Sequence, residues 1–543
     1  MLTPTATPRT AGRPRIIAVG LDGFEPSIAA ALMARGKLPM LQRLQRDAAL
    51  FSLDHGPARE TGLAWEHFAT GQDPDRYRRW SAVTFDSRRY RATQEPTRSR
   101  TFLADVDARV VAFDVPYLDL TAAARVKGMA NWGAHDPGVG AHAQPSGLAA
   151  EILARFGPYP AKPYIYGFVW PCPQRSAAMG EALAEAVRTR AAITSWLLRE
   201  RYPDFDLGIT VIGELHSAAE ALWHGWDADH PLHGLPSAAP AASGIEAVYV
   251  ATDGFLAQLA AEHPDATLLA FSMHGMGPNH SDTASMMLLP ELLYRRRFGA
   301  ALFQPRDDWT LPCPQLRPNE EWACAIHRQI RPRSIRHLYR HLQAAGQRVL
   351  GRLQGRLRGP GHNARSLAWM PASRYQSYWR DMDAFALPAF YDGQIRINLA
   401  GREVAGTVSR SRYPELLDEL EAWLRQAIDP VTGAEAVAAI ERPLADDPFS
   451  DHATRCDLKI TWRGHLCALK LPGQGLVGPV PQRRTGGHTG KCGYAALFSP
   501  SITAGDYGHA SAFDVAPTLL SLLGEPLPQD LCGSPLRPMP SSA

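Results

Sequence analysis

A threonine hydroxyl and a carboxylate stand out first among the side chains that could do chemistry. Thr61 lies in the stretch GPARETGLAWEHFATG, and Asp22 directly follows the apolar run Ile16 to Leu21. A threonine hydroxyl is a weak nucleophile at its ordinary pKa, so it needs a bound metal to become reactive. Asp22 is the natural carboxylate to share that metal. The plainer interpretation of Thr61 is a cap at the start of the helix that follows it.

Two histidines and a glutamate form a second group of chemically capable side chains. His216 and Glu220 are four residues apart in LHSAAEALW, whose composition is helical, so they share one face of the expected helix. With His488, from the glycine-rich TGGHTGKCG, they make a His/Glu/His set that suits zinc and leaves one coordination position open. The alternative is that His216 and Glu220 are an ordinary pair on a helix surface.

Short apolar runs predict the strands that would carry these residues, and helical stretches alternate with them. The expected strands are 16–21, 49–53, 110–113, 207–212 and 267–272, and the expected helices include 26–35, 176–201, 244–262 and 513–523. This alternation predicts an α/β fold with a doubly wound, mostly parallel sheet flanked by helices. Asp22, His216 and His274 follow three of these strands and are therefore expected at one edge of the sheet.

Changes in composition along the chain suggest its organisation. Residues 1–14 are expected to be a disordered lead-in, 15–294 the first part of the α/β core, and 386–540 its second part with a small hairpin region. Residues 295–385 are rich in arginine and predict an inserted subdomain. This insertion is interpreted as a solvated helical segment or as a surface for an anionic substrate or partner.

The overall composition argues against several classes of protein. The net charge of +3 gives no case for a nucleic acid polymer as partner. The seven cysteines are scattered and form no CxxC pair, which argues against a disulfide framework and a cysteine-rich zinc site. The polar, proline-rich beginning does not have the pattern of a secretory signal, and no apolar run reaches about 18 residues, the length that spans a membrane. A cytoplasmic protein without a membrane span is the resulting expectation.

Six segments, taken in order, resemble the type I phosphodiesterase/nucleotide pyrophosphatase branch of the alkaline phosphatase superfamily. They are GLDGFEP, ETGLAWEHFATGQDP, GELHSAAEALWHGWDADHP, SMHGMGPN, LPAFYDGQIRINLAGREVAG, and GGHTGKCG followed by FDVAPTLLSLLGEPLP. The resemblance covers roughly the first seventy residues, 207–290 and most of 384–540. It implies an alkaline-phosphatase-like fold and a small phosphorylated substrate, hydrolysed as a phosphate ester or diester.

The resemblance also implies roles for particular residues. Thr61 would be the metal-bound nucleophile. One or two divalent ions, zinc or manganese, would be bound by six metal ligands: Asp22, Thr61, His216, Glu220, His274 and His488. The transferred group would be held by these ions and would pass through a phospho-threonine.

Some positions depart from the family pattern. Met273 stands where the family has an aspartate before His274, and a thioether does not replace a hard carboxylate at such a site. His216 and Glu220 also invert the usual order of aspartate and histidine, and Glu214 could substitute for the lost ligand. Two alternatives to hydrolysis therefore stay open: a phosphoryl-type transferase on the same scaffold, and a non-catalytic protein that binds a phosphorylated ligand.

Overall fold

A computed structural model gives the structure of the chain and describes residues 13–94, 100–133, 140–164, 170–317, 320–331, 365–450 and 456–538. Nearly all of the lead-in expected over 1–14 lies outside these residues, as does the 332–364 part of the expected insertion. Within the described residues, no helix is long and apolar enough to span a bilayer.

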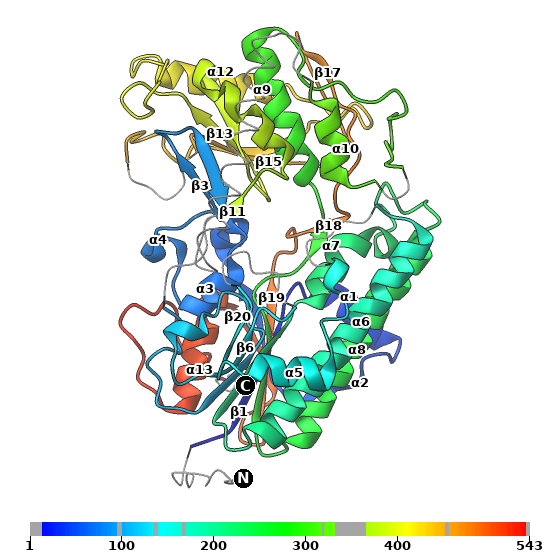
Figure 1. Cartoon of the computed structure of the whole chain (residues 1–543), viewed down its shortest axis with the longest axis vertical. Coiled ribbons are helices and arrows are strands. Elements are labelled where there is room, and N and C mark those ends of the chain that lie inside the picture. Colours follow the sequence, from blue (N-terminus) through cyan, green and yellow to red (C-terminus); the bar gives the residue numbers. More distant parts are fainter. Residues whose placement is uncertain are drawn as a thin grey trace.

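A large sheet forms the centre of the lower lobe (Figure 1), with strands in the order β20-β2-β19-β9-β1-β8-β5-β6-β7. All of these strands run parallel to one another except β19 and β7. The mostly parallel sheet predicted from the sequence is therefore confirmed. The bounds are β1 Ile16–Leu21, β2 Ala49–Asp54, β5 Val110–Phe113, β6 Lys127–Ala130, β7 His142–Gln144, β8 Leu207–Ile212, β9 Thr267–Ser272, β19 Gly493–Phe498 and β20 Gly505–Ser511.

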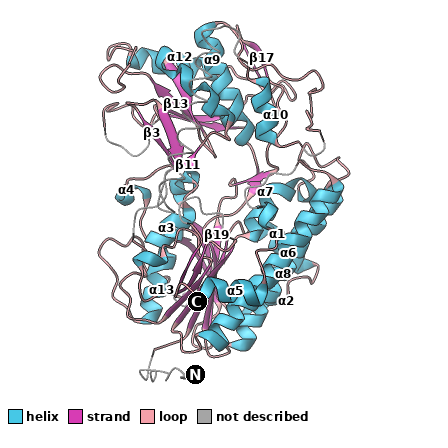
Figure 2. Ribbon diagram, in the orientation of Figure 1, coloured by secondary structure: helices cyan, strands magenta, loops and turns pink. Residues whose placement is uncertain are grey.

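Helices cover both faces of this sheet (Figure 2), because successive side chains of its central strand point to opposite faces and both sets are apolar. Ile17 and Val19 pack into one core, whereas Ile16 and Ala18 pack into another. The first core is completed by α1 Pro26–Ala34, α2 Pro39–Asp47, α5 Leu148–Phe156, α6 Pro173–Trp196, α7 Glu214–Trp226 and α8 Ala238–Glu262. The second is completed by α3 Ala64–Thr70 and α13 Val515–Leu523.

A second, smaller lobe is built around an antiparallel sheet of order β12-β13-β15-β14 (Figure 1, top). Its core also takes in α9, α10, α12 and an extended 3-10 segment, Pro371–Asp381. The bounds are β12 Ala384–Leu387, β13 Gly393–Ile397, β14 Val437–Glu441, β15 Leu458–Trp462, α9 Leu289–Phe298, α10 Trp322–Gln329 and α12 Tyr413–Leu424. The β12-β13 pair is a hairpin at the start of the region in which a small hairpin is expected.

Short elements complete the fold. They are α4 Pro74–Tyr77, β3 Val83–Asp86, β4 Arg91–Gln94, β10 Gly277–Pro278, β11 Arg365–Ser366, β16 Leu469–Leu471, β17 Gly475–Val477 and β18 Gly486–Gly487.

The described flanks of the arginine-rich region contain buried aromatic residues and are therefore not a solvated segment. Trp322, Tyr375 and Trp379 are fully buried in the core of the second lobe, because their aromatic surface packs there and not against solvent.

Candidate active site

One cavity of about 410 Å³ brings together the six residues that the sequence predicts as the site. Its lining includes Asp22, Thr61, His216, Glu220, His274 and His488. These residues come from five separate segments, and the second lobe closes the cavity with Trp322, Trp369 and Phe390. The volume falls in the range of small-molecule sites, which is about 300 to 1,000 Å³.

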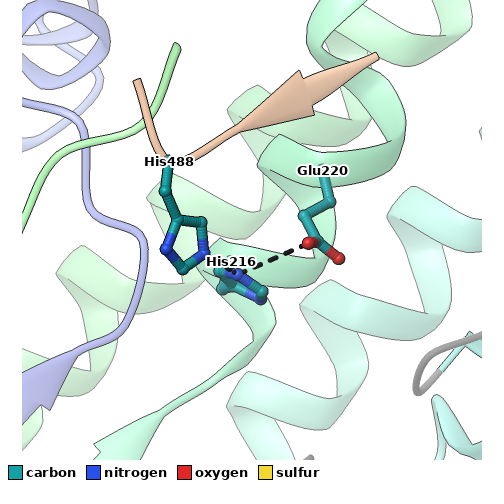
Figure 3. Close-up of side chains that lie close together, drawn as sticks. All are labelled: His216, Glu220 and His488. Atoms are coloured by element: carbon teal, nitrogen blue, oxygen red, sulfur yellow. Dashed lines mark hydrogen bonds and ion pairs between the residues drawn. The ribbon is translucent and has the colours of Figure 1, made fainter. Parts of the chain in front are cut away.

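Three of these lining residues, His216, Glu220 and His488, lie close together (Figure 3). The Nε2 atoms of the two imidazoles are 2.7 Å apart, and His216 Nε2 lies 3.6 Å from Glu220 Oε1. One donor atom from each residue lies within 4.8 Å of the other two. Nitrogen ligands sit about 2.0–2.1 Å from zinc, so the two imidazoles need to separate only slightly to hold an ion. The donor set therefore fits one divalent metal ion, with zinc favoured by the imidazoles.

The fold explains why these three ligands meet although 268 residues separate Glu220 from His488 in the sequence. Helix α7 starts two residues after β8 ends, and this places His216 and Glu220 above the carboxyl edge of the sheet. His488 lies between β18 and β19. Because β19 runs antiparallel to β9, its first residue lies at the edge where the parallel strands end.

Two rings flank His488 and fix its position. The His274 and Tyr391 rings each lie 4.3 Å from the His488 ring, both at 32° to it. The Tyr391 hydroxyl is also 3.4 Å from His488 Nε2. Tyr391 in turn rests against Gly62, where any side chain would overlap its ring. Gly62, the residue after Thr61, thus leaves room for the Tyr391 ring that packs on His488 of the candidate metal site.

Thr61 ends a 3-10 helix, Gly56–Thr61, and does not cap α3. Helix α3 begins at Ala64, and its capping position is Leu63, which offers no side-chain hydrogen bond. The Thr61 hydroxyl donates to the carbonyl of Ala58 at 2.7 Å and accepts from the backbone N–H of Leu63 at 3.1 Å. The capping interpretation is therefore wrong, and the two contacts hold the hydroxyl in one orientation inside the cavity wall.

Asp22 and His274 are buried beside Thr61 in the same lining. Burial raises the pKa of Asp22 to about 7, and the negative charge of Glu214 adds to this shift. Burial lowers the pKa of His274 to about 4. Its Nδ1 lies 2.9 Å from the carbonyl oxygen of Gly275, so Nδ1 carries the proton and Nε2 carries the lone pair. The neutral His274 ring thus keeps one nitrogen able to accept a hydrogen bond or bind a metal, whereas Asp22 is about half protonated at pH 7.

Only one group of three His, Cys, Asp or Glu residues in the described part of the chain has metal-ligand spacing, and it is His216, Glu220 and His488. Met273 is buried in the apolar core below the sheet, next to residues such as Trp65 and Phe271. Its thioether serves that core as a packing group. Asp22, Thr61 and His274, the other ligands that the resemblance implies, include only two residues of these types, so a second ion at these three residues stays a prediction.

Glu214 does not replace the missing ligand. Its carboxylate accepts two hydrogen bonds from Arg190, at 3.2 and 2.9 Å, and both side chains are fully buried. Arg190 also donates to Asp114 at 2.8 Å. The expectation that Glu214 could turn into the metal site is wrong, because turning would leave a buried arginine short of a partner.

Two arginines of the cavity were not identified from the sequence. Arg484 forms an ion pair with Glu220, and Arg483 donates to Asp282 at 2.6 Å and stacks on Trp369 at 4.9 Å. The pair stands just before the glycine-rich segment of His488, which is the signal that could have drawn attention to it. Trp322 and Trp369 come from the arginine-rich region, where no motif marked them.

No known protein-family model matches the chain, and no curated protein matches it either. Among solved structures it is similar to phosphonoacetate hydrolase from Sinorhizobium meliloti 1021 with phosphonoformate, at 15% identity and TM-score 0.43, covering 94% of this chain and 95% of that one. Murine ectonucleotide pyrophosphatase/phosphodiesterase 5 with AMP matches at 10% identity and TM-score 0.44, covering 96% and 97%. A mutant of the alkaline phosphatase PafA matches at 9% identity and TM-score 0.49, covering 97% and 99%.

These matches name the same kinds of protein as the resemblance in the sequence, namely an alkaline phosphatase and a nucleotide pyrophosphatase/phosphodiesterase. At identities of 15% or less and TM-scores below 0.5, the likeness carries no information on activity or substrate.

Proposed function

We propose that this protein hydrolyses a phosphate ester or diester of a small molecule, with Thr61 as the nucleophile and one divalent metal ion, zinc in the first instance, at His216, Glu220 and His488. The observation that supports this most is the shared cavity: the Thr61 hydroxyl and the three donors line the same 410 Å³ space. Metal-assisted phosphoryl transfer to a side chain requires at least a nucleophile and a metal site that face the same cavity.

The bound metal would supply Lewis-acid polarisation of the phosphoryl group and favour the deprotonated form of the nucleophile. The protein's own residues would orient the nucleophile and stabilise the charge that develops on it. The N–H of Leu63 donates to Thr61 Oγ1, so it stabilises negative charge that grows on this oxygen as its proton leaves. Attack of Oγ1 on phosphorus forms the phospho-threonine and releases the alcohol, which takes up a proton. Water then cleaves the phospho-threonine and restores the hydroxyl; it releases inorganic phosphate when the substrate is a monoester, and the remaining phosphate monoester when the substrate is a diester.

Aromatic side chains would shield these steps from bulk water. Trp65, Tyr117, Trp322, Trp369 and Phe390 line the cavity. Such walls lower the local dielectric constant, so the fixed positive charges of the cavity act more strongly on a phosphoryl anion. They also give an organic leaving group an apolar surface on which to rest.

The proposal is tested with purified protein, zinc and bis-p-nitrophenyl phosphate, followed by release of p-nitrophenol. We expect Thr61→Ala to lower kcat about 10³-fold or more, because loss of a covalent nucleophile removes the main route. Zinc content should stay unchanged, since the three ligands of the proposed site, His216, Glu220 and His488, are intact. Equal rates for Thr61→Ala and the wild type would refute the nucleophile.

Thr70→Ala is the matched control. Thr70 is buried like Thr61 and also donates its hydroxyl to a backbone carbonyl, that of Glu66, at 2.8 Å, but it does not line the cavity. It should keep most of the activity. Product analysis in the presence of an added alcohol separates the two reaction types: p-nitrophenyl phosphate indicates hydrolysis of the diester, and a mixed diester that contains the added alcohol indicates transfer.

A further inference from the structure

Arg484 is held by the same carboxylate that belongs to the candidate metal site. Its Nη1 forms an ion pair with Oε1 of Glu220, and its Nε lies 3.7 Å from Oδ2 of Asp282. The side chains of Arg484 and Glu220 are only 12% and 13% exposed, so solvent screens this pair weakly. Asp282 already receives a 2.6 Å hydrogen bond from Arg483. Of these two carboxylates, Glu220 is the one closer to Arg484.

A metal ion and Arg484 compete for the same oxygen atom. Oε1 of Glu220 is the atom that lies 3.6 Å from His216 Nε2, on the side where the two imidazoles converge. Two cations cannot both take the full charge of one carboxylate, and at short range in a partly buried site they repel each other. Binding of a divalent ion at His216, Glu220 and His488 would consequently weaken the hold of Glu220 on Arg484.

The cavity offers Arg484 a second place for its guanidinium. Arg484 lines the same space as Thr61 and His488, whereas Arg483 is fixed by Asp282 and by the face of Trp369. A guanidinium that loses a carboxylate regains its hydrogen bonds best from another planar pair of oxygens, as on a phosphoryl or phosphonyl group. Such a group would lie between Arg484 and the metal.

We propose that Arg484 changes partner when the metal binds: it pairs with Glu220 in the metal-free protein and clamps a tetrahedral oxyanion of the substrate in the metal-loaded protein. This inference rests on the proposed metal site. It makes Arg484 an antagonist of metal binding and a contributor to anion binding. The phosphoryl group would therefore bind after the metal and not before it.

Opposite changes in two affinities distinguish this exchange from a structural role. In Arg484→Gln, zinc should bind roughly five- to tenfold more tightly, because its competitor for Glu220 is gone. Inorganic phosphate should bind to the zinc-loaded variant at least about tenfold more weakly, because a charged bidentate contact is lost. Zinc affinity is measured by competition with a chromophoric chelator, and phosphate affinity by calorimetry. Neither measurement needs turnover.

Two further variants complete the test. Arg306→Gln removes a matched ion pair, since Arg306 and Glu320 are 13% and 12% exposed and do not line the cavity, and it should change neither affinity. Arg484→Lys keeps the charge without the bidentate fork and should give intermediate phosphate affinity.

The outcomes separate this inference from the proposed function. Weaker zinc binding and unchanged phosphate binding in Arg484→Gln would mean that Arg484 merely orients Glu220, and would overturn the exchange. Failure of the wild type to bind zinc would overturn it as well. Opposite shifts in a protein that hydrolyses no ester would support the exchange and refute only the hydrolase.

Discussion

Gly62 follows Thr61 and contacts Tyr391, which packs on His488 of the candidate metal site. Its φ of +68° lies in the left-handed region, and a Cβ there would overlap the Tyr391 ring that packs on His488. We expect Gly62→Ala to destabilise the protein by about 1–3 kcal/mol, combining backbone strain with displacement of the ring. Zinc affinity should fall as well, because His488 loses its support. Thermal unfolding and chelator competition measure the two effects.

The Gly56→Ala variant separates the effect of backbone strain from the effect of displacing the Tyr391 ring. Gly56 begins the same 3-10 helix with a φ of +56°, but a Cβ at this position would meet nothing within 4 Å. The variant should therefore lose some stability and keep its zinc affinity. Equal losses of zinc affinity in both variants would show that the helix as a whole matters, and that the contact between Gly62 and Tyr391 does not.

At the scale of elements, a buried arginine fixes the helix that carries two of the expected ligands. Arg190 of α6 contacts Glu214, the first residue of α7, and Asp114, which follows β5. Arg190→Met leaves two buried carboxylates without their cation and should cost about 3–5 kcal/mol of unfolding free energy. Arg188→Met, two residues away, removes an exposed pair with Glu185 and should change stability by less than about 1 kcal/mol. Urea denaturation compares the two variants.

A similar loss of stability in both variants would contradict the structural role of the Arg190 network. A large loss of stability in Arg190→Met alone would explain why Glu214 does not turn toward a metal, although it lies only two residues before His216.

The same elements show what the sequence could and could not predict. Strands β1, β8 and β9 have the expected bounds, because continuous runs of β-branched and apolar residues in a parallel sheet have few other structures. The polar residues that follow these strands, Asp22, His216 and His274, were expected at one edge of the sheet, and all three line one cavity. That pattern does not tell which polar residue faces the cavity and which faces a buried partner. Glu214 was misjudged for this reason, since Arg190 lies on another helix, 24 residues earlier.

At the scale of the whole molecule, the two lobes meet around Thr61. Glu60, the neighbour of Thr61, forms an ion pair with Lys459 of β15 in the second lobe. Asp392 and Lys459 also line a small cavity with Thr61. The second lobe thus holds the 3-10 helix of Thr61 from one side, while the sheet supports the proposed metal ligands from the other. Contacts of this kind join segments about 400 residues apart, and local sequence patterns do not encode them.

Histidines buried in the neutral form should make the whole protein sensitive to acid. Burial lowers the pKa of His67 to about 3, of His224 to about 4 and of His230 to about 2. The unfolded chain protonates these groups near pH 6.5, so their contribution to stability is complete above that pH and is lost as the pH falls toward the lower folded values. Asp392, whose pKa burial raises to about 6, acts in the opposite direction, since its contribution is lost as the pH rises through 6.

His67→Gln isolates one of these contributions. His67 is fully buried, with its Nδ1 3.1 Å from Nε2 of His55. Between pH 7 and pH 5 the wild type should lose about 2 kcal/mol more unfolding free energy than the variant, because glutamine takes up no proton on unfolding. Urea denaturation at the two pH values gives the difference, and exposed His509→Gln should leave the pH dependence of the wild type unchanged. Parallel pH profiles for His67→Gln and the wild type would show that this ring is already protonated, or already solvated, in the folded protein.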